Sequence, residues 1–212
     1  MAYQAILGQS KPTVENYRKA VEKLYGDKSE EVLAVYSAST DEASEQVATD
    51  LASDRFIGFS TWKWSDVQSK TGAKPVYRYL YARPRPHMRS EMGNATSGSA
   101  ARVVRDTAAN KAPQVQPAGG AVHSAEIEYA LGNLSTNRVY DWQPADYRVS
   151  EIMQTFFANF IKTGNPNGLG VPEWLAVDNN KGVQVMHIDV NTKSFEDKNK
   201  NRYLLMEKTA KR

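Results

Sequence analysis

Residues 120–134 read GAVHSAEIEYALGNL and contain the histidine that stands out most in this chain, His123. Two glycines and an alanine precede it, where a turn would enter a helix expected over residues 124–131. A glycine-preceded loop holds a side chain at the end of an element and lets other backbone approach closely, which suits a general base. Glu126 follows three residues later, a spacing that would place it on the same helix face.

For the other two histidines, the surrounding sequence predicts structural roles. His87 lies among arginines in the segment 83–89, which is expected to be a solvated basic loop, and His187 lies in an apolar strand, where a half-buried structural residue is expected. These three are the only side chains that titrate near neutral pH without a large pKa shift. His123 with Glu126 could also begin a metal site, but no third ligand stands at a typical spacing.

Composition excludes several classes of protein. The 212 residues include 27 Lys+Arg, 24 Asp+Glu and no cysteine, so disulfide scaffolds, cysteine metal sites and thiol catalysis are ruled out. A net charge of +3 is weak support for a nucleic-acid partner. No apolar run approaches a membrane span, and the first residues lack the features of a signal peptide. No Gly-x-Ser-x-Gly, phosphate-loop, dinucleotide or zinc-protease motif is found, and no cofactor is expected.

The first third of the chain predicts helices. Apolar spacings of three and four indicate helices over residues 16–26 and 30–36, and a capping box of Ser39 and Glu42 is expected to begin a third. An aromatic-rich segment then ends near residue 72. Its four large aromatic side chains are expected to lie in the core: Phe56, Phe59, Trp62 and Trp64.

The remainder predicts a few strands and one long helix. Residues 75–81 read as a strand covered on both faces, and residues 183–190 and 202–206 as two further strands. The apolar pattern of residues 149–161 indicates the strongest helix of the chain, which ends at Gly164. Residues 88–116 have no periodicity and are expected to form an irregular insert, either solvated or lid-like.

The order of these segments resembles the type-B carboxylesterase and lipase family. Residues 120–132 fit its signature Gly-x-x-His-x-x-Glu-x-x-Tyr/Phe-x-x-Gly. The block FANFIKTGNPN at residues 157–167 is similar to the helix and turn that follow in the family, and residues 172–174 and 186–189 continue in the same order. Four blocks in the correct order, over roughly residues 54–188, make the resemblance specific.

This resemblance implies an α/β-hydrolase fold and a serine hydrolase that cleaves carboxylic esters with a Ser, His and Glu or Asp triad. The matching histidine is His123, as the base that serves the serine, and Glu126 matches a supporting acid. The nucleophile, the oxyanion loop and the triad acid have no counterpart in this chain. The resemblance therefore implies that residues 1–212 are the C-terminal part of a single α/β-hydrolase domain, helix-rich with a few strands and inactive alone.

Two partners follow from this interpretation, a small carboxylic ester as substrate and the N-terminal part of the same enzyme. A non-catalytic binding or interaction module derived from the same fold is the alternative, and a self-contained core would favour it. Localisation stays open, because any signal peptide would belong to the N-terminal part, as it would in a secreted or periplasmic protein.

Overall fold

A computed structural model of the chain describes residues 2–92, 96–97, 103–104, 120–178 and 183–210. The chain divides into two compact units. Residues 1–74 and 197–212 form one, called here the helical unit, and residues 75–196 form the other, called the sheet unit. Each has its own cluster of buried apolar side chains. The single α/β-hydrolase domain expected over the whole chain stays a prediction.

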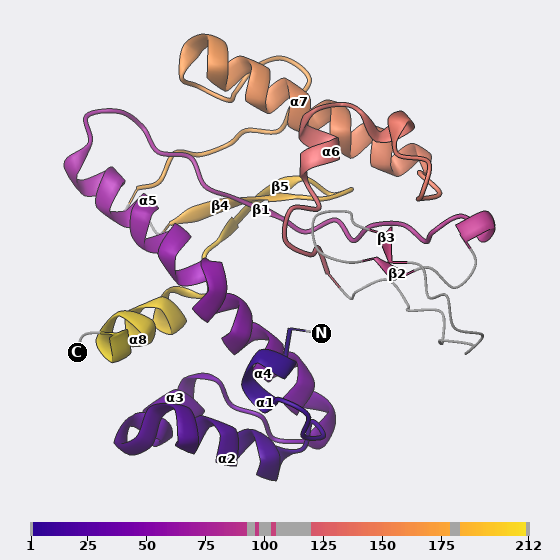
Figure 1. The fold of residues 1–212 in the computed structure, drawn as a ribbon. Helices are drawn as coiled ribbons and strands as arrows, with labels where there is room; N and C mark the ends of the chain where they lie inside the picture. The colour runs from indigo at the N-terminus through magenta and orange to yellow at the C-terminus, as the bar shows by residue number, and fades with distance from the viewer. Residues whose placement is uncertain (1, 93–95, 98–102, 105–119, 179–182, 211–212) are drawn as a thin grey trace. The chain divides into compact units, whose positions relative to one another are not determined.

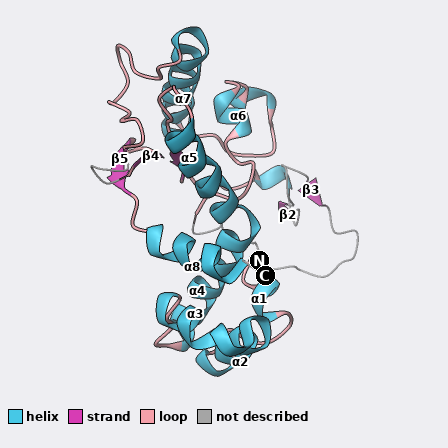
Figure 2. Cartoon of the chain, turned by 90° about the vertical axis from the view of Figure 1, so that its left-hand side faces the viewer, coloured by secondary structure: helices cyan, strands magenta, loops and turns pink. Residues whose placement is uncertain are grey.

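The helical unit is built of helices packed around a small core (Figure 2). The predicted first and second helices are confirmed, and Gly26 ends the first of them with a φ of +56°. One turn of π-helix, over Asp54–Gly58, separates the two longest helices of this unit. The elements of the helical unit are α1 (Gln4–Leu7), α2 (Val14–Tyr25), η1 (Gly26–Lys28), α3 (Ser29–Val35), α4 (Asp41–Ser53), η2 (Asp54–Gly58), α5 (Phe59–Thr71) and α8 (Lys200–Ala210).

Two secondary-structure predictions for this unit are wrong. The cap of α4 is Thr40 and not Ser39, because Thr40 has extended backbone and its hydroxyl accepts the Ala43 amide at 3.2 Å. Residues 202–206 are part of helix α8 and not a strand. Tyr203 and Met206, three residues apart, share a helix face, and both are buried.

The aromatic segment is only partly in the core. Trp62 is buried and stacks on Tyr203 with ring centroids 5.4 Å apart. Phe56 and Trp64 are instead 69% and 76% exposed, so the prediction that all four aromatics are buried is wrong. The reason is helical geometry, because Trp64 lies two residues beyond Trp62 and points about 200° away around α5.

The sheet unit contains a three-stranded sheet with α6 and α7 on one side (Figure 1). The strand order is β1-β4-β5, in which β1 pairs parallel to β4 and β4 antiparallel to β5. A separate antiparallel pair is formed by β2 and β3. The elements are β1 (Tyr79–Tyr81), η3 (Ser90–Met92), β2 (Thr96–Ser97), β3 (Val103–Val104), α6 (Ile127–Ala130), η5 (Leu134–Thr136), α7 (Pro144–Thr163), β4 (Gln184–Ile188) and β5 (Lys193–Glu196).

Helix α7 confirms the strongest prediction from the sequence. Gln143 and Asp146 form a capping box at its start, and Gly164 ends it in the left-handed conformation. Its apolar stripe packs on the sheet and on the segment that leads into α6. The buried side chains of this core are Tyr81, Ala125, Tyr129, Leu134, Tyr140, Trp142, Val149, Met153, Phe156, Trp174, Met186 and Ile188.

The predicted strands differ from the structure in detail. The strand expected over 75–81 is limited to β1, and its Leu80 is 53% exposed, so the expected coverage on both faces is wrong. The strand expected over 183–190 is confirmed as β4, and the third strand is β5 instead of residues 202–206. Most of the predicted insert 88–116 lies outside the described residues. Its described parts include η3, β2 and β3, and its role as a lid stays a prediction.

Candidate functional site

His123 lies in a turn that leads into α6, with its side chain exposed. The helix expected over 124–131 is shorter, because α6 begins only at Ile127. The next residue, Ser124, has a φ of +66°, a left-handed conformation that non-glycine residues rarely adopt. Ala125 is fully buried, and its amide donates to the Val122 carbonyl at 3.1 Å. The turn is therefore anchored in the core directly beside an exposed imidazole.

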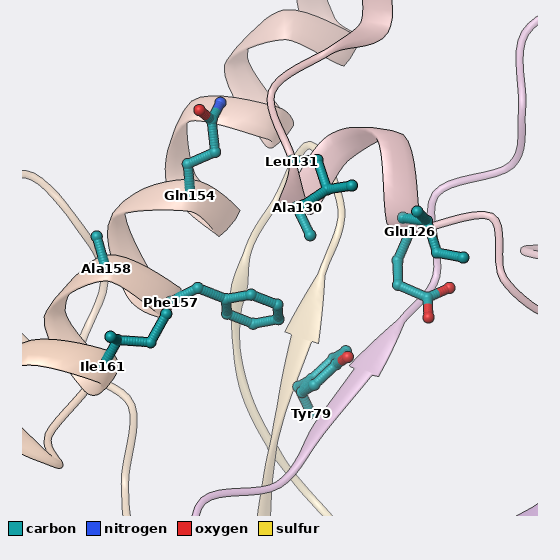
Figure 3. A pocket seen from close by; sticks show the side chains of 9 residues that line it. Tyr79, Glu126, Ala130, Leu131, Gln154, Phe157, Ala158 and Ile161 are labelled. Carbon is teal, nitrogen blue, oxygen red and sulfur yellow. The ribbon is translucent and has the colours of Figure 1, made fainter.

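Glu126 lines an open hollow of about 540 Å³ between β1, α6 and α7 (Figure 3). Burial raises the pKa of the Tyr79 phenol on the floor of this hollow, and the nearby Glu126 carboxylate adds to the effect. His123 and Glu126 thus belong to one turn, but His123 is not among the residues that line the hollow. The lining side chains are Tyr79, Glu126, Ile127, Ala130, Leu131, Gln154, Phe157, Ala158 and Ile161.

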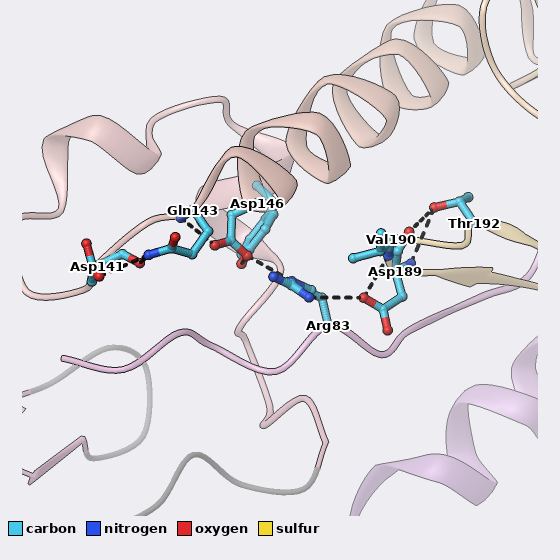
Figure 4. Close-up of polar contacts among 8 residues, drawn as sticks. Arg83, Asp141, Gln143, Asp146, Asp189, Val190 and Thr192 are labelled. Carbon is cyan, nitrogen blue, oxygen red and sulfur yellow. Dashed lines mark hydrogen bonds and ion pairs between the residues drawn. The ribbon is translucent and has the colours of Figure 1, made fainter.

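A buried carboxylate, Asp146, connects the elements around this site (Figure 4). It accepts the Arg83 Nε–H at 2.8 Å, the Tyr129 hydroxyl at 2.9 Å and the Gln143 amide at 2.8 Å. Arg83 also lies 3.8 Å from Asp189, just after β4. These contacts tie the segment after β1 to the body of α6 and to the first turn of α7, and so fix the helix that follows His123.

A second ion pair holds the same helix. Arg85 pairs with Glu128 of α6, and Asn137 donates to the other carboxylate oxygen. The Arg85 guanidinium lies over the Tyr140 ring, 4.9 Å from its centroid. The prediction of a solvated basic loop over 83–89 is therefore wrong for Arg83 and Arg85. Sequence reasoning missed both pairs, although the alternation of arginine and proline over residues 83–86 was a signal of a fixed segment.

The other histidines lie where the sequence predicted. His87 is exposed, and its carbonyl accepts the Asp141 amide at 2.9 Å. His187 is half-buried in β4, and its ring meets Phe195 edge-on at 5.4 Å. Within the described part of the chain, no group of three or more histidine or acidic side chains could hold a metal ion. In the same residues, no helix has the length and apolar character needed to cross a bilayer.

Comparison with known proteins gives one family and several esterases. The model of the carboxylesterase family matches residues 5–206. A pyrethroid hydrolase of Rattus norvegicus, Ces2e, is 31% identical over 68 residues, which are 32% of this chain and 12% of that protein.

Solved structures show a similar fold. The carboxylesterase EST55 of Geobacillus stearothermophilus matches with a TM-score of 0.60 and 17% identity, over 90% of this chain and 34% of its own. A PNB esterase matches with a TM-score of 0.57 and 20% identity, over 96% of this chain and 36% of its own. An esterase of Clostridium hathewayi that can hydrolyse aliphatic aromatic polyesters matches with a TM-score of 0.52 and 18% identity, over 92% and 32%. This chain therefore spans about a third of the solved structures that it resembles and a smaller share of the curated relative.

Proposed function

The chain belongs to the carboxylesterase family, and from this premise we propose that it supplies the catalytic histidine of a serine carboxylic-ester hydrolase. The nucleophilic serine, the oxyanion loop and the triad acid would lie in a preceding part of the polypeptide. Residues 1–212 would then be the C-terminal part of a single α/β-hydrolase domain. The solved esterases support this proposal, because they share the fold of this chain and the chain spans only about a third of their length.

The observation that carries the proposal is the presentation of His123. Its exposed imidazole lies on a turn in which the next residue, Ser124, has a left-handed backbone conformation. The buried Ala125 and Tyr129 hold the following segment in the core. Backbone held in a sparsely populated conformation by a packed surrounding is a common property of catalytic residues. An exposed side chain on a rigid support is what a general base needs to meet a group from outside the chain.

In the proposed reaction, His123 accepts the hydroxyl proton of the serine while the serine oxygen attacks the ester carbonyl. The protonated imidazole then donates this proton to the leaving alcohol, and an acyl-enzyme remains. In the second half, His123 takes a proton from water, which attacks the acyl group, and it then returns a proton to the serine oxygen as the acid is released. Glu126, half-buried in the same turn, would support the turn as a second acid and take no proton in the reaction.

The 212 residues contain no Gly-x-Ser-x-Gly sequence for the nucleophile. A base without its nucleophile and oxyanion hole cannot transfer an acyl group, so the chain alone is expected to be inactive. Its partners would be the N-terminal part of the same enzyme and a small carboxylic ester.

The test compares the 212-residue chain with the same chain extended by the reading frame that precedes it. Turnover of p-nitrophenyl acetate and labelling by a fluorophosphonate are measured for both. The short chain should give neither, and the extended one should give both. His123→Asn should lower turnover of the extended chain by about 10³-fold or more, while the matched control His87→Asn leaves it unchanged. Labelling of the short chain, or an active His123→Asn variant, would contradict the proposal.

A non-catalytic binding module of the same fold is the second candidate, and one observation favours it. Each unit has a buried core of its own, as a self-contained module requires. A sharp, cooperative thermal transition of the 212-residue chain, together with no fluorophosphonate labelling of the extended chain, would support the module over the enzyme.

A further inference from the structure

The turn that follows α7 contains the pair Asn167-Gly168, and no other asparagine in the sequence is followed by glycine. An asparagine before glycine can lose its side-chain amide without an enzyme. The backbone nitrogen of the glycine attacks Cγ of the asparagine, and no Cβ on the glycine stands in the way. Gly168 is exposed, so water reaches the bond that would be modified. This pair is therefore a candidate site of covalent modification in the sheet unit.

Three hydrogen bonds hold the side-chain amide of Asn167 in this turn. Its Oδ1 accepts the Trp174 amide at 2.6 Å, and its Nδ2 donates to the Trp174 carbonyl at 2.9 Å. Nδ2 also donates to Asn165 Oδ1 at 2.9 Å. The amide thus pairs with the backbone of Trp174 in the way that one strand residue pairs with another. These three hydrogen bonds are called here the Asn167 clamp.

The partner of the Asn167 clamp is fixed in the core. Trp174 is 4% exposed, and its indole Nε1 donates to the Arg78 carbonyl at 3.1 Å. Its ring meets three other aromatic rings edge-on, with centroids 4.9–6.2 Å away, those of Tyr77, Tyr79 and Phe156. Because Trp174 is anchored in this way, the Asn167 clamp breaks whenever the turn moves away from the core.

The closed clamp opposes the first step of deamidation. When the Gly168 nitrogen attacks Cγ of Asn167, this carbon becomes tetrahedral, and Oδ1 and Nδ2 leave the plane in which they meet Trp174. The three hydrogen bonds must therefore weaken or break before the new carbon–nitrogen bond forms. A reaction within a chain needs its reacting atoms in an aligned conformation, and the closed clamp holds the amide out of it.

We propose that Asn167 is a site of spontaneous deamidation, which the Asn167 clamp holds back while the turn is closed and permits when the turn opens. A bond forms between the Gly168 nitrogen and Cγ, and the bond between Cγ and Nδ2 breaks. The Gly168 amide proton goes to the departing nitrogen, which leaves as ammonia. Water then hydrolyses one of the two imide bonds and leaves aspartate or isoaspartate at position 167.

The product cannot close the clamp again. A carboxylate at position 167 has acceptor oxygens and no donor, so one of them would face the Trp174 carbonyl and Asn165 Oδ1, which are also acceptors. The turn is therefore expected to stay open once the reaction has occurred. This inference is independent of the proposed function, because it needs neither the serine nor an ester and applies equally to a binding module.

Peptide mapping by mass spectrometry tests the site in the whole translated polypeptide that contains residues 1–212. The polypeptide is incubated in buffer and in concentrated urea at one pH and temperature. In urea, Asn167 should deamidate faster than every other asparagine, and Gly168→Ala should slow this reaction several-fold. In buffer, Asn167 should react at least about tenfold more slowly than in urea. Equal rates in buffer and urea, or a faster reaction at another asparagine in urea, would overturn the proposal.

Two variants test the clamp itself. Asn165→Ala removes the oxygen that accepts both the backbone amide of Asn167, at 3.0 Å, and its Nδ2. Deamidation in buffer should then be at least about fivefold faster, with no change in urea. Tyr77→Phe is the matched control, because it removes only a long hydrogen bond of 3.4 Å to the same oxygen. It should leave the rate within about twofold. An unchanged rate in Asn165→Ala would contradict the role of the clamp.

Asn167→Asp tests the state after the reaction. This variant should melt about 4 °C or more below the unsubstituted polypeptide, because its carboxylate cannot donate to Trp174. Asn165→Asp keeps an acceptor where Asn165 accepts and should shift the melting temperature by less than about 2 °C. Equal shifts in the two variants would show that the product does not hold the turn open.

Discussion

Two buried aspartates, Asp146 in the sheet unit and Asp54 in the helical unit, lie in contrasting surroundings. Asp146 accepts hydrogen bonds from a guanidinium, a phenol and a backbone amide, all within 2.9 Å. Asp54 accepts the Tyr36 hydroxyl at 2.8 Å, and Arg202 lies 3.9 Å away because its closer contact, at 2.9 Å, is to Asp50.

The consequence is electrostatic. Burial raises the pKa of Asp54, and this effect exceeds the opposing influence of the Tyr36 hydroxyl and the Arg202 charge. Burying a carboxylate costs free energy that hydrogen bonds and an ion pair must offset. Burial alone therefore does not identify a structural carboxylate. The number and charge of its donors decide whether it fixes neighbouring elements, as Asp146 does around the candidate site.

The largest effect is expected from Asp146→Ala. This substitution leaves the Arg83 guanidinium and the Tyr129 hydroxyl without their acceptor and should lower the free energy of unfolding by about 3 kcal/mol. Urea unfolding followed by circular dichroism measures it. The control is Asp141→Ala, an exposed aspartate before the same helix, which should cost less than about 0.5 kcal/mol. Equal losses of unfolding free energy in the two variants would contradict the stabilising role assigned to Asp146.

A smaller loss of stability is expected when one hydroxyl donor is removed from each carboxylate. Tyr36→Phe removes the close donor of Asp54 and should cost about 2 kcal/mol, whereas Tyr129→Phe leaves Asp146 two donors and should cost about 1 kcal/mol. Both variants keep the aromatic ring, so the comparison isolates the hydroxyl. If Tyr129→Phe proved the costlier of the two in urea unfolding, the proposed dependence on donor number would be wrong.

The smallest effect is a pH dependence at Asp54. Because its pKa in the folded state is raised above 3.8, the folded state favours the protonated carboxyl. The stability that Asp54 contributes is therefore present below that value and is lost as the pH rises through the folded pKa. The asparagine of Asp54→Asn has no carboxyl group to ionise, so this variant does not lose stability in that way. Its melting temperature relative to the unsubstituted chain should therefore rise between pH 4 and pH 7.

Thermal unfolding at four or five pH values measures this difference. Glu45→Gln, at an exposed position on α4, is the control and should show a flat difference. A difference for Asp54→Asn that falls with rising pH would show that the carboxylate is stabilised in its charged form, as a well-paired one would be.

Local patterns predicted the local elements. The apolar spacing of residues 149–161 and the glycine that follows predicted α7 and its end, because a helix face depends on neighbours three and four residues apart. The same reasoning failed for residues 202–206. Their aromatic and apolar composition suits a strand, and packing in the helical unit made them a helix instead.

The candidate site also contains residues that the sequence predicts and residues that it does not. His123 and Glu126 were found from a short motif and a resemblance. Arg83, Arg85 and Asp146 were missed, because Arg83 meets an acid 63 residues away and Arg85 one 43 residues away. No pattern within a single sequence contains separations of that kind. The exposed Trp64 shows the same limit, since composition predicts burial but cannot say which face of a helix meets the core.

Four features follow from the sequence alone: the family resemblance, the helix-rich α/β character, the long helix α7 and a histidine just before α6. Each of these depends on residues that are close together in the chain or on their order along it. The three-dimensional fold was needed to establish which buried carboxylate has three donors, which arginines are paired, and which strands lie at the edges of the sheet. Those properties depend on distances between segments remote in sequence, and on the desolvation that packing imposes there.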